Sequence, residues 1–161
     1  MSRGSKKQRL IEELSEQFRV NGIQDIAFDT VVAERLGINR TDLNCIDIIE
    51  RHGGVTAGEL ATEAGLTTGA VTAVIDRLER AGYALRVRDE EDRRRVKVEV
   101  TPKLQREAGK IYGPMMSEWQ AVMDSATTEQ LRLMVEFMRA GLEVKPRHIE
   151  RVRSGDGQRR A

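Results

Sequence analysis

The sequence has few of the residues that support disulfide, metal or membrane chemistry. Among its 161 residues there is one cysteine, Cys45, which excludes an internal disulfide. The two histidines, His52 and His148, do not stand at the spacing of a metal site. No apolar run approaches the roughly 20 residues needed to cross a bilayer, and the polar N-terminus has no signal-peptide core. We therefore expect a cytoplasmic protein with no membrane segment, no metal and no cofactor.

An excess of charge of one sign is also missing. The chain has 27 basic and 26 acidic residues, a formal net charge of +1. This balance argues against a protein that holds nucleic acid by basic excess alone. No H-x-x-x-H, C-x-x-C or G-x-S-x-G motif is present, so an enzyme is the less favoured class. The length suits one domain with a core, or a small domain plus an oligomerisation arm.

What is present is a pattern of helix, turn and second helix. Thr56 and Glu59 form a T-x-x-E capping box, which predicts a short helix that Gly65 ends. Thr67 or Thr68 is expected to cap the next helix, which runs to Gly82. Its apolar residues recur at three- and four-residue spacing, so one face packs inward. These inward residues are Ala70, Val71, Val74, Ile75 and Leu78.

Two short segments after these helices alternate apolar and charged residues. The period of two over 84–88 and 96–100 predicts paired strands that are exposed on one side. The connection between them, DEEDRRR, contains three consecutive arginines, Arg93, Arg94 and Arg95. Crowded cations are unfavourable unless water solvates them or an anion is near, and the minor groove of A·T-rich DNA supplies such an anionic potential.

Amphipathic helical patterns flank this region on both sides. Residues 8–36 carry an apolar stripe, and a second stripe recurs from 103 to 144. Helices of this length with so much apolar surface need a partner. The basic residues 145–161 are expected to form a flexible tail, with contact to phosphates as the less favoured alternative.

The order helix, helix, winged hairpin resembles the MarR family of winged helix-turn-helix regulators. The resemblance rests on LATEAGLTTGAVTAVIDRLERAGYALRVRDEEDRRRVKVEVTPK, and within it on DRLERAGY, the D-x-R of Asp92 and Arg94, and the closing Val100-Thr101-Pro102. It implies a mainly α fold with a small β-wing. A single domain over 1–161 would have its winged helix-turn-helix at 39–101, flanked by dimerisation helices at 8–36 and 103–144.

The resemblance also implies a homodimeric repressor of transcription that binds double-stranded DNA. Two recognition helices about one turn of DNA apart, roughly 34 Å, would match a palindromic operator. The recognition helix would enter the major groove and the wing the minor groove, with Asp92 as a brace for a wing arginine. The expected DNA contacts are Thr56, Thr67, Thr68, Gly69, Ala70, Thr72, Arg77, Arg88, Arg93, Arg94 and Arg95.

Each of these assignments has a plainer alternative. The threonines can simply cap or decorate helices, and the arginine run can be a solvated loop. Arg77 can contact phosphate, or it can equally pair with Asp76, Glu79 or an acid elsewhere. Because Ala73 is small, base readout would depend on Thr72 and on DNA shape. The winged helix can also serve protein contact alone.

Two further expectations concern regulation. Many MarR relatives release DNA when a small aromatic or phenolic anion binds between the dimer helices and the DNA module, and the resemblance implies such a pocket near Phe28, Ile49 and Tyr112. Cys45 is expected to be a small core residue, because a thiol switch needs a lowered pKa. The oxidant-sensing cysteine of some relatives lies in the first helix, so that role does not carry over to Cys45.

Overall fold

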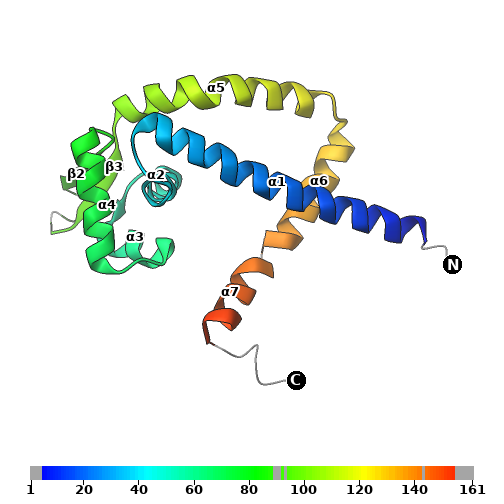
Figure 1. The fold of residues 1–161 in the computed structure, drawn as a ribbon, viewed down its shortest axis with the longest axis horizontal. Helices are drawn as coiled ribbons and strands as arrows, with labels where there is room; N and C mark the ends of the chain where they lie inside the picture. The colour runs from blue at the N-terminus through cyan, green and yellow to red at the C-terminus, as the bar shows by residue number, and fades with distance from the viewer. Residues whose placement is uncertain (1–4, 89–91, 93, 143, 155–161) are drawn as a thin grey trace. The chain divides into compact units, whose positions relative to one another are not determined.

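The computed structural model describes residues 5–88, 92, 94–142 and 144–154. By its internal contacts the chain divides into two units, Met1–Tyr112 and Gly113–Ala161. The boundary falls just before Pro114, inside a helix that lacks one backbone hydrogen bond there because proline has no N–H. The elements are α1 (Lys6–Leu36), α2 (Arg40–His52), β1 (Val55–Thr56), α3 (Ala57–Ala64), α4 (Thr68–Ala81), β2 (Ala84–Arg88), β3 (Val96–Val100), α5 (Pro102–Asp124), α6 (Thr128–Leu142) and α7 (Val144–Ser154) (Figure 1).

Local sequence signals set the helix boundaries in the first unit. Asn39 begins α2 with a capping box that includes Asp42, and Thr56 begins α3 with the expected box to Glu59. Thr67, rather than Thr68, caps α4. Gly65 and Gly82 end α3 and α4 with φ of 66° and 72°, a conformation that disfavours residues with a Cβ. The boundaries of both helices of the helix-turn-helix are therefore set by their own capping residues.

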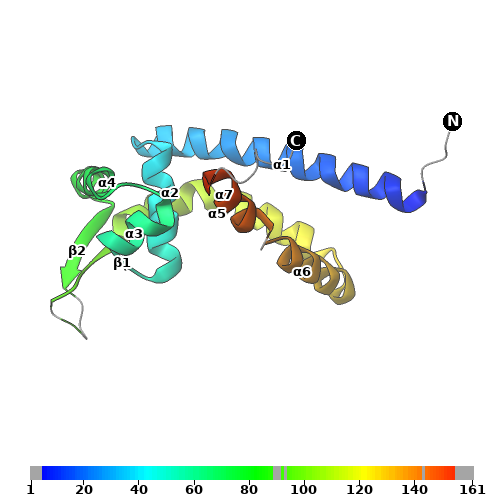
Figure 2. The same cartoon turned by 90° about the horizontal axis from the view of Figure 1, so that it is seen from below.

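The small sheet is antiparallel, with strand order β1-β3-β2. Ala84 pairs with Val100 and Arg88 with Val96, so both predicted strands are confirmed residue for residue. The two-residue strand β1, which the sequence analysis did not anticipate, pairs Val55 with Val98. Figure 2 shows β2 reaching beyond α3, away from α2. The fold expected of the chain, mainly α with a small β-wing, is confirmed.

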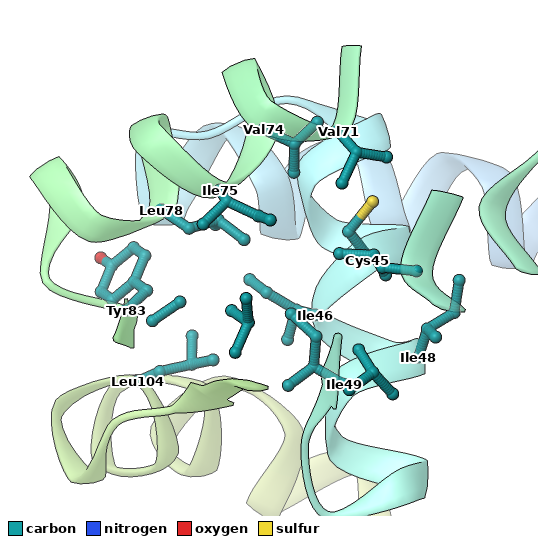
Figure 3. Packing of buried hydrophobic residues seen from close by; sticks show 14 of the residues in the cluster. Cys45, Ile46, Ile48, Ile49, Val71, Val74, Ile75, Leu78, Tyr83 and Leu104 are labelled. Carbon is teal, nitrogen blue, oxygen red and sulfur yellow. The ribbon is translucent and has the colours of Figure 1, made fainter. Parts of the chain in front are cut away.

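One hydrophobic core holds the first unit together (Figure 3). Residues from the end of α1, from α2, α3 and α4, from the sheet and from the start of α5 meet in it. The interior therefore fixes the two DNA-module helices against the helices that precede and follow them. Its members are Val32, Leu36, Cys45, Ile46, Ile48, Ile49, Val55, Leu60, Val71, Val74, Ile75, Leu78, Tyr83, Ala84, Val98 and Leu104.

The second unit comprises the rest of α5 with α6 and α7. The tail expected to be flexible over 145–161 is instead helical over Val144–Ser154, and residues 155–161 lie outside the described residues. Pro146 is compatible with this helix because it stands in the first turn, where no backbone N–H is needed. Ile149 and Val152 then share a face at three-residue spacing. In the described part of the chain, no helix combines the length and apolarity that crossing a bilayer requires.

Candidate nucleic-acid interface

The N-terminal turn of α4 is the most exposed part of the helix-turn-helix. Val71, Ile75 and Leu78 are fully buried and hold the opposite face of α4 in the core. The exposed face therefore begins with a row of small side chains and free backbone N–H groups at the positive end of the helix dipole, a setting that suits an anion. The exposed residues in this turn are Thr67, Thr68, Gly69, Ala70 and Thr72, so the prediction from periodicity that Ala70 packs inward is wrong.

Two of these threonines also serve the helix itself. The Thr67 hydroxyl oxygen accepts a hydrogen bond from the backbone N–H of Ala70, at 3.3 Å. The Thr72 hydroxyl donates to the carbonyl of Thr68, at 3.0 Å. Because the Thr72 hydroxyl donates its proton to that carbonyl, its exposed oxygen can act only as an acceptor, for example from a base amino group. Thr67 and Thr72 therefore stabilise the helix and are exposed at the same time. Their contact with DNA stays a prediction.

Arg77 is held by an acid that is distant in sequence. Its Nη2 lies 2.6 Å from Oδ1 of Asp42, and its Nε lies 3.1 Å from Oδ2. Asp42 is 1% exposed, and it also accepts from the backbone N–H of Asn39 at the start of α2. The hydrogen bond to Asp42 raises the pKa of Arg77. Of the two alternatives, the structure thus contains the ion pair, and this pair fixes α4 to α2.

Two arginines near the base of the wing, Arg95 and Arg86, are also paired with acids. Nη2 of Arg95 lies 2.7 Å from Oε1 of Glu59 at the start of α3. Hydrogen bonds from Thr56, and then the charge of Arg95, lower the pKa of Glu59. Arg86 of β2 forms ion pairs with Asp76 and Glu79 of α4. Neither set of partners was predicted from the sequence, because Glu59 and Arg95 are 36 positions apart and no local pattern joins Arg86 of the strand to the acids of α4.

The wing tip contains a turn built on Asp92. Its carboxylate accepts from the backbone N–H of Arg94 at 3.0 Å, and its carbonyl accepts from the N–H of Arg95 at 2.8 Å. The Asp92 carboxylate therefore contacts the backbone of Arg94, and its role as a brace that holds the direction of a wing arginine stays a prediction. Arg94 and Arg88 are exposed, whereas the predicted contact Arg93 lies outside the described residues.

Thr56, another predicted DNA contact, ends β1 and caps α3. Its hydroxyl donates to Glu59 at 2.9 Å and accepts from the backbone N–H of Glu59 at 3.3 Å. The hydroxyl is therefore engaged in the capping box, and its role as a DNA contact stays a prediction. We call the exposed turn of α4, with the exposed wing residues Arg88 and Arg94, the reading surface.

A cavity of about 530 Å³ lies beside the junction of α1, α2 and the start of α5. Tyr112 lines it, and the Phe28 ring meets Tyr112 edge-on at a centroid distance of 5.5 Å. Ile49, which was expected at the same pocket, is fully buried in the core and borders a separate hollow beside Gly53. The expectation for Ile49 is wrong, because the inner stripe of α2 faces the core and not the cavity.

The cavity beside Tyr112 carries acidic groups. Burial, and then the charges of Asp29, Asp47 and Glu50, raise the pKa of Tyr112. Burial and the charge of Asp47 likewise raise the pKa of Glu50. These three carboxylates line the cavity, where Arg40 is the cation among the lining residues. Such a lining disfavours the anionic ligand that the resemblance implied.

Cys45 behaves as the core residue expected of it. Its side chain is 0% exposed. Burial, together with the charge of Asp42, raises the thiol pKa to about 11. A thiol switch requires a shift in the other direction. Within the described residues, no cluster of three or more histidine, cysteine or carboxylate side chains could hold a metal ion.

Comparisons with known proteins agree with this geometry. Residues 38–96 match the model of the MarR family. The HTH-type transcriptional regulator YcgE of Bacillus subtilis is 33% identical over 153 residues, which cover 95% of this chain and 99% of that protein. YkoM of the same organism is 31% identical over 66% of this chain and 70% of its own length.

Solved structures share the fold at lower sequence identity. A MarR family protein from Bacillus stearothermophilus is 22% identical, with a TM-score of 0.61, over 82% of this chain and 92% of its own. A point mutant of MepR from S. aureus, solved bound to an oligodeoxyribonucleotide, is 19% identical, with a TM-score of 0.54, over 81% of this chain and 96% of its own. With a relative of one-third identity along nearly its full length, the chain belongs to the MarR family of transcriptional regulators.

Proposed function

We propose that the protein is a homodimeric repressor that binds a palindromic operator in double-stranded DNA. The observation that carries this proposal is the reading surface: an exposed helix N-terminus with small hydroxyl side chains beside a hairpin that presents Arg94. A helix of this kind fits the major groove, and the adjacent arginine reaches the minor groove. The protein would act by binding alone, without a catalytic group, and in the cytoplasm.

Charge in the winged helix favours recognition by placement over attraction by net charge. Between residues 38 and 101 the sequence has ten basic and twelve acidic residues. Arg77, Arg86 and Arg95 are already paired with acids. Non-specific affinity, which depends on the number of phosphates neutralised, is then low. Arg94 and Arg88 carry the largest share of the groove contacts in this proposal.

A second copy of the chain would cover the apolar surface of the arms, by which we mean the predicted dimerisation helices 8–36 and 103–144. Helix α6 has no buried residue, although it carries large apolar side chains that are 48% to 66% exposed, among them Met134, Val135, Met138 and Leu142. Monomeric proteins rarely leave contiguous apolar surface of this kind in water. A two-fold dimer would bury both sets of arms and would place two copies of α4 at a fixed separation.

DNA binding can be tested with the duplex immediately upstream of the protein's own coding region. A gel-shift titration at several salt concentrations gives both the affinity and the number of phosphate contacts. We expect Arg94→Ala to weaken operator binding by roughly tenfold or more and to reduce the salt slope by about one. Arg106→Ala removes the same charge from an exposed position on α5 and should change neither. A winged helix used for protein contact would show no salt-dependent binding to any duplex.

We further propose that a small aromatic or phenolic effector releases the DNA by binding the cavity beside Phe28 and Tyr112. The three lining carboxylates favour an amine-bearing effector over a carboxylate-bearing one. A ligand can weaken DNA binding only by preferring the released state, with a coupling of about 1–3 kcal/mol. Thermal-shift assays with benzylamine-type and benzoate-type compounds of the same size should show stabilisation by the amines only. Equal shifts, or none, would contradict the proposal for the effector.

A further inference from the structure

One phenol joins three segments of the first unit. Tyr83 follows the end of α4 by two residues, and its side chain is 5% exposed. Its hydroxyl oxygen lies 2.6 Å from Oε2 of Glu107 on α5 and 3.1 Å from the carbonyl oxygen of Leu36, the last residue of α1. Figure 3 shows the ring beside Leu78 and Leu104. The recognition helix is thus tied through one side chain to α1 and to α5.

Neighbouring contacts fix the same joint from the side of α5. Lys103 lies over the Tyr83 ring, with Nζ 5.0 Å from the centroid, and donates to the carbonyl of Ala81 at 2.8 Å. The Thr101 hydroxyl donates to the carbonyl of Gly82 at 2.7 Å, and the Thr101 N–H donates to the carbonyl of Tyr83. These contacts hold α4 to α5 but do not involve α1. The Tyr83 hydroxyl therefore adds a connection to α1 that they do not supply.

The phenol is well suited to remain a donor at this position. Burial, and then the hydrogen bond to Glu107, raise the pKa of Tyr83 to about 12. The O–H proton consequently stays on oxygen across the physiological range. A hydrogen bond from a neutral donor to a carboxylate is stronger than one between neutral groups. The group is thus a permanent contact between elements and is unsuited to act as a titrating switch.

We propose that Tyr83 is a positioning residue for DNA recognition: its hydroxyl, which shares its one proton between the carboxylate of Glu107 and the carbonyl of Leu36, sets the orientation of the recognition helix on α1 and α5. This inference rests on the proposed function, in which those two helices carry the dimer and two copies of α4 must match successive major grooves. A residue far from the reading surface then determines whether both copies of α4 fit the operator at once. Loss of the bond would leave the contacts with DNA intact but their spacing loose.

The variant Tyr83→Phe tests this role, because it removes one hydroxyl and leaves the packed ring in place. We expect operator affinity to fall about tenfold, because only part of the protein would then hold both copies of α4 in the orientation that fits the operator. Affinity for a random duplex and the salt slope should stay unchanged, because no phosphate contact is removed. The melting temperature should change by no more than about 4 °C. The decisive measurement is the ratio of operator affinity to random-duplex affinity. A purely structural role for Tyr83 would lower both affinities alike and leave this ratio unchanged.

Variants at Glu107 provide the matched controls. Glu107→Gln retains an acceptor for the phenol and should keep most of the wild-type selectivity. Glu107→Ala removes the contact with α5 but leaves the one with Leu36, so its selectivity should fall by less than that of Tyr83→Phe. Glu118→Ala removes an exposed carboxylate from the same helix and should have no effect. Tyr83→Phe with wild-type selectivity, or Glu107→Ala with operator and random affinities reduced alike, would overturn the proposal.

A distance measurement separates this proposal from the proposed function. Spin labels on Ala73→Cys in α4 and Lys110→Cys in α5, both exposed positions, report the angle between these helices within one chain diluted with unlabelled protein. Cys45 is buried and does not compete for the label. Tyr83→Phe should broaden the distance distribution. If wild-type protein bound no operator, the proposed function would fail, while an unchanged distribution would refute the joint independently.

Discussion

Apolar side chains are buried between residues 32 and 104 but exposed in the helices on either side of this segment. All buried hydrophobic residues of the described structure lie in this segment, from Val32 to Leu104. In α6 and α7, no residue is buried, although apolar side chains recur along both helices. The first half of α1 is likewise exposed at Leu10, Leu14 and Phe18. The winged helix therefore buries its apolar residues within one chain, whereas the helices on either side leave theirs exposed.

This contrast separates two sources of stability. The core of the winged helix is intramolecular, so its contribution does not depend on protein concentration. The proposed burial of the arms is intermolecular, so its contribution does. Substitutions in the two regions should consequently differ in kind: one class shifts the melting temperature of the module, and the other shifts the association equilibrium.

The arms should be most sensitive to a charge on their apolar face. Met134 on α6 is 61% exposed in the single chain. If a partner covers it, Met134→Glu loses about 1.5 kcal/mol or more of burial at each of two symmetric positions and also introduces a buried charge. We expect the dimer dissociation constant to rise at least about 100-fold, measured by sedimentation equilibrium.

The matched control for this substitution lies one helical turn earlier. Gln130→Glu adds the same charge to α6 but keeps the capping box with Thr127, because either residue can accept from its backbone N–H. Its dissociation constant should stay near that of the wild type. Equal association by Met134→Glu, or a monomeric wild type, would remove the contrast between the arms and the module.

Within the module, the largest single effect should come from Arg77. Arg77→Ala leaves the Asp42 carboxylate buried without its cation, a loss that typically costs 3–5 kcal/mol. Because Arg77 is partly exposed, we expect about 3 kcal/mol, measured by urea unfolding. Arg80→Ala, on the exposed side of the same helix, should stay within about 0.5 kcal/mol. If Arg77→Ala also leaves the dimer dissociation constant unchanged, the stability of the winged helix and the association of the arms are independent properties.

Periodicity and capping signals predicted the module well because its structure is encoded locally. Thr56, Gly65 and Gly82 mark helix ends through their own backbone preferences. The alternation over 84–88 and 96–100 defined the strands because one face of the sheet is buried. The strand β1 was missed, since two residues are too few to show a period. Residues 145–154 were expected to be loose because basic composition was given more weight than the helical spacing of Ile149 and Val152.

The site was harder to predict, because its arrangement depends on contacts between residues distant in sequence. The pairs Arg77–Asp42 and Arg95–Glu59 join positions 35 and 36 residues apart. No local pattern chooses among the many acids that could serve as partners. The same reason explains Ile49: its place on the inner stripe of α2 was recognised, but whether that stripe faced a cavity or the core depended on how α1 and α5 pack.

The smallest effect is expected at Cys45, which tests how well the core is sealed. With the pKa raised to about 11, only about one thiol in a thousand is ionised at pH 8. The native thiol should resist Ellman's reagent, whereas protein unfolded in urea should react at once. Because the folded thiol holds its proton above the pH at which the unfolded thiol loses it, stability should decline as the pH rises from about 9 to 11. Operator binding should be insensitive to peroxide, and a peroxide-dependent loss of binding that thiol reductants restore would show that the module opens in its native state.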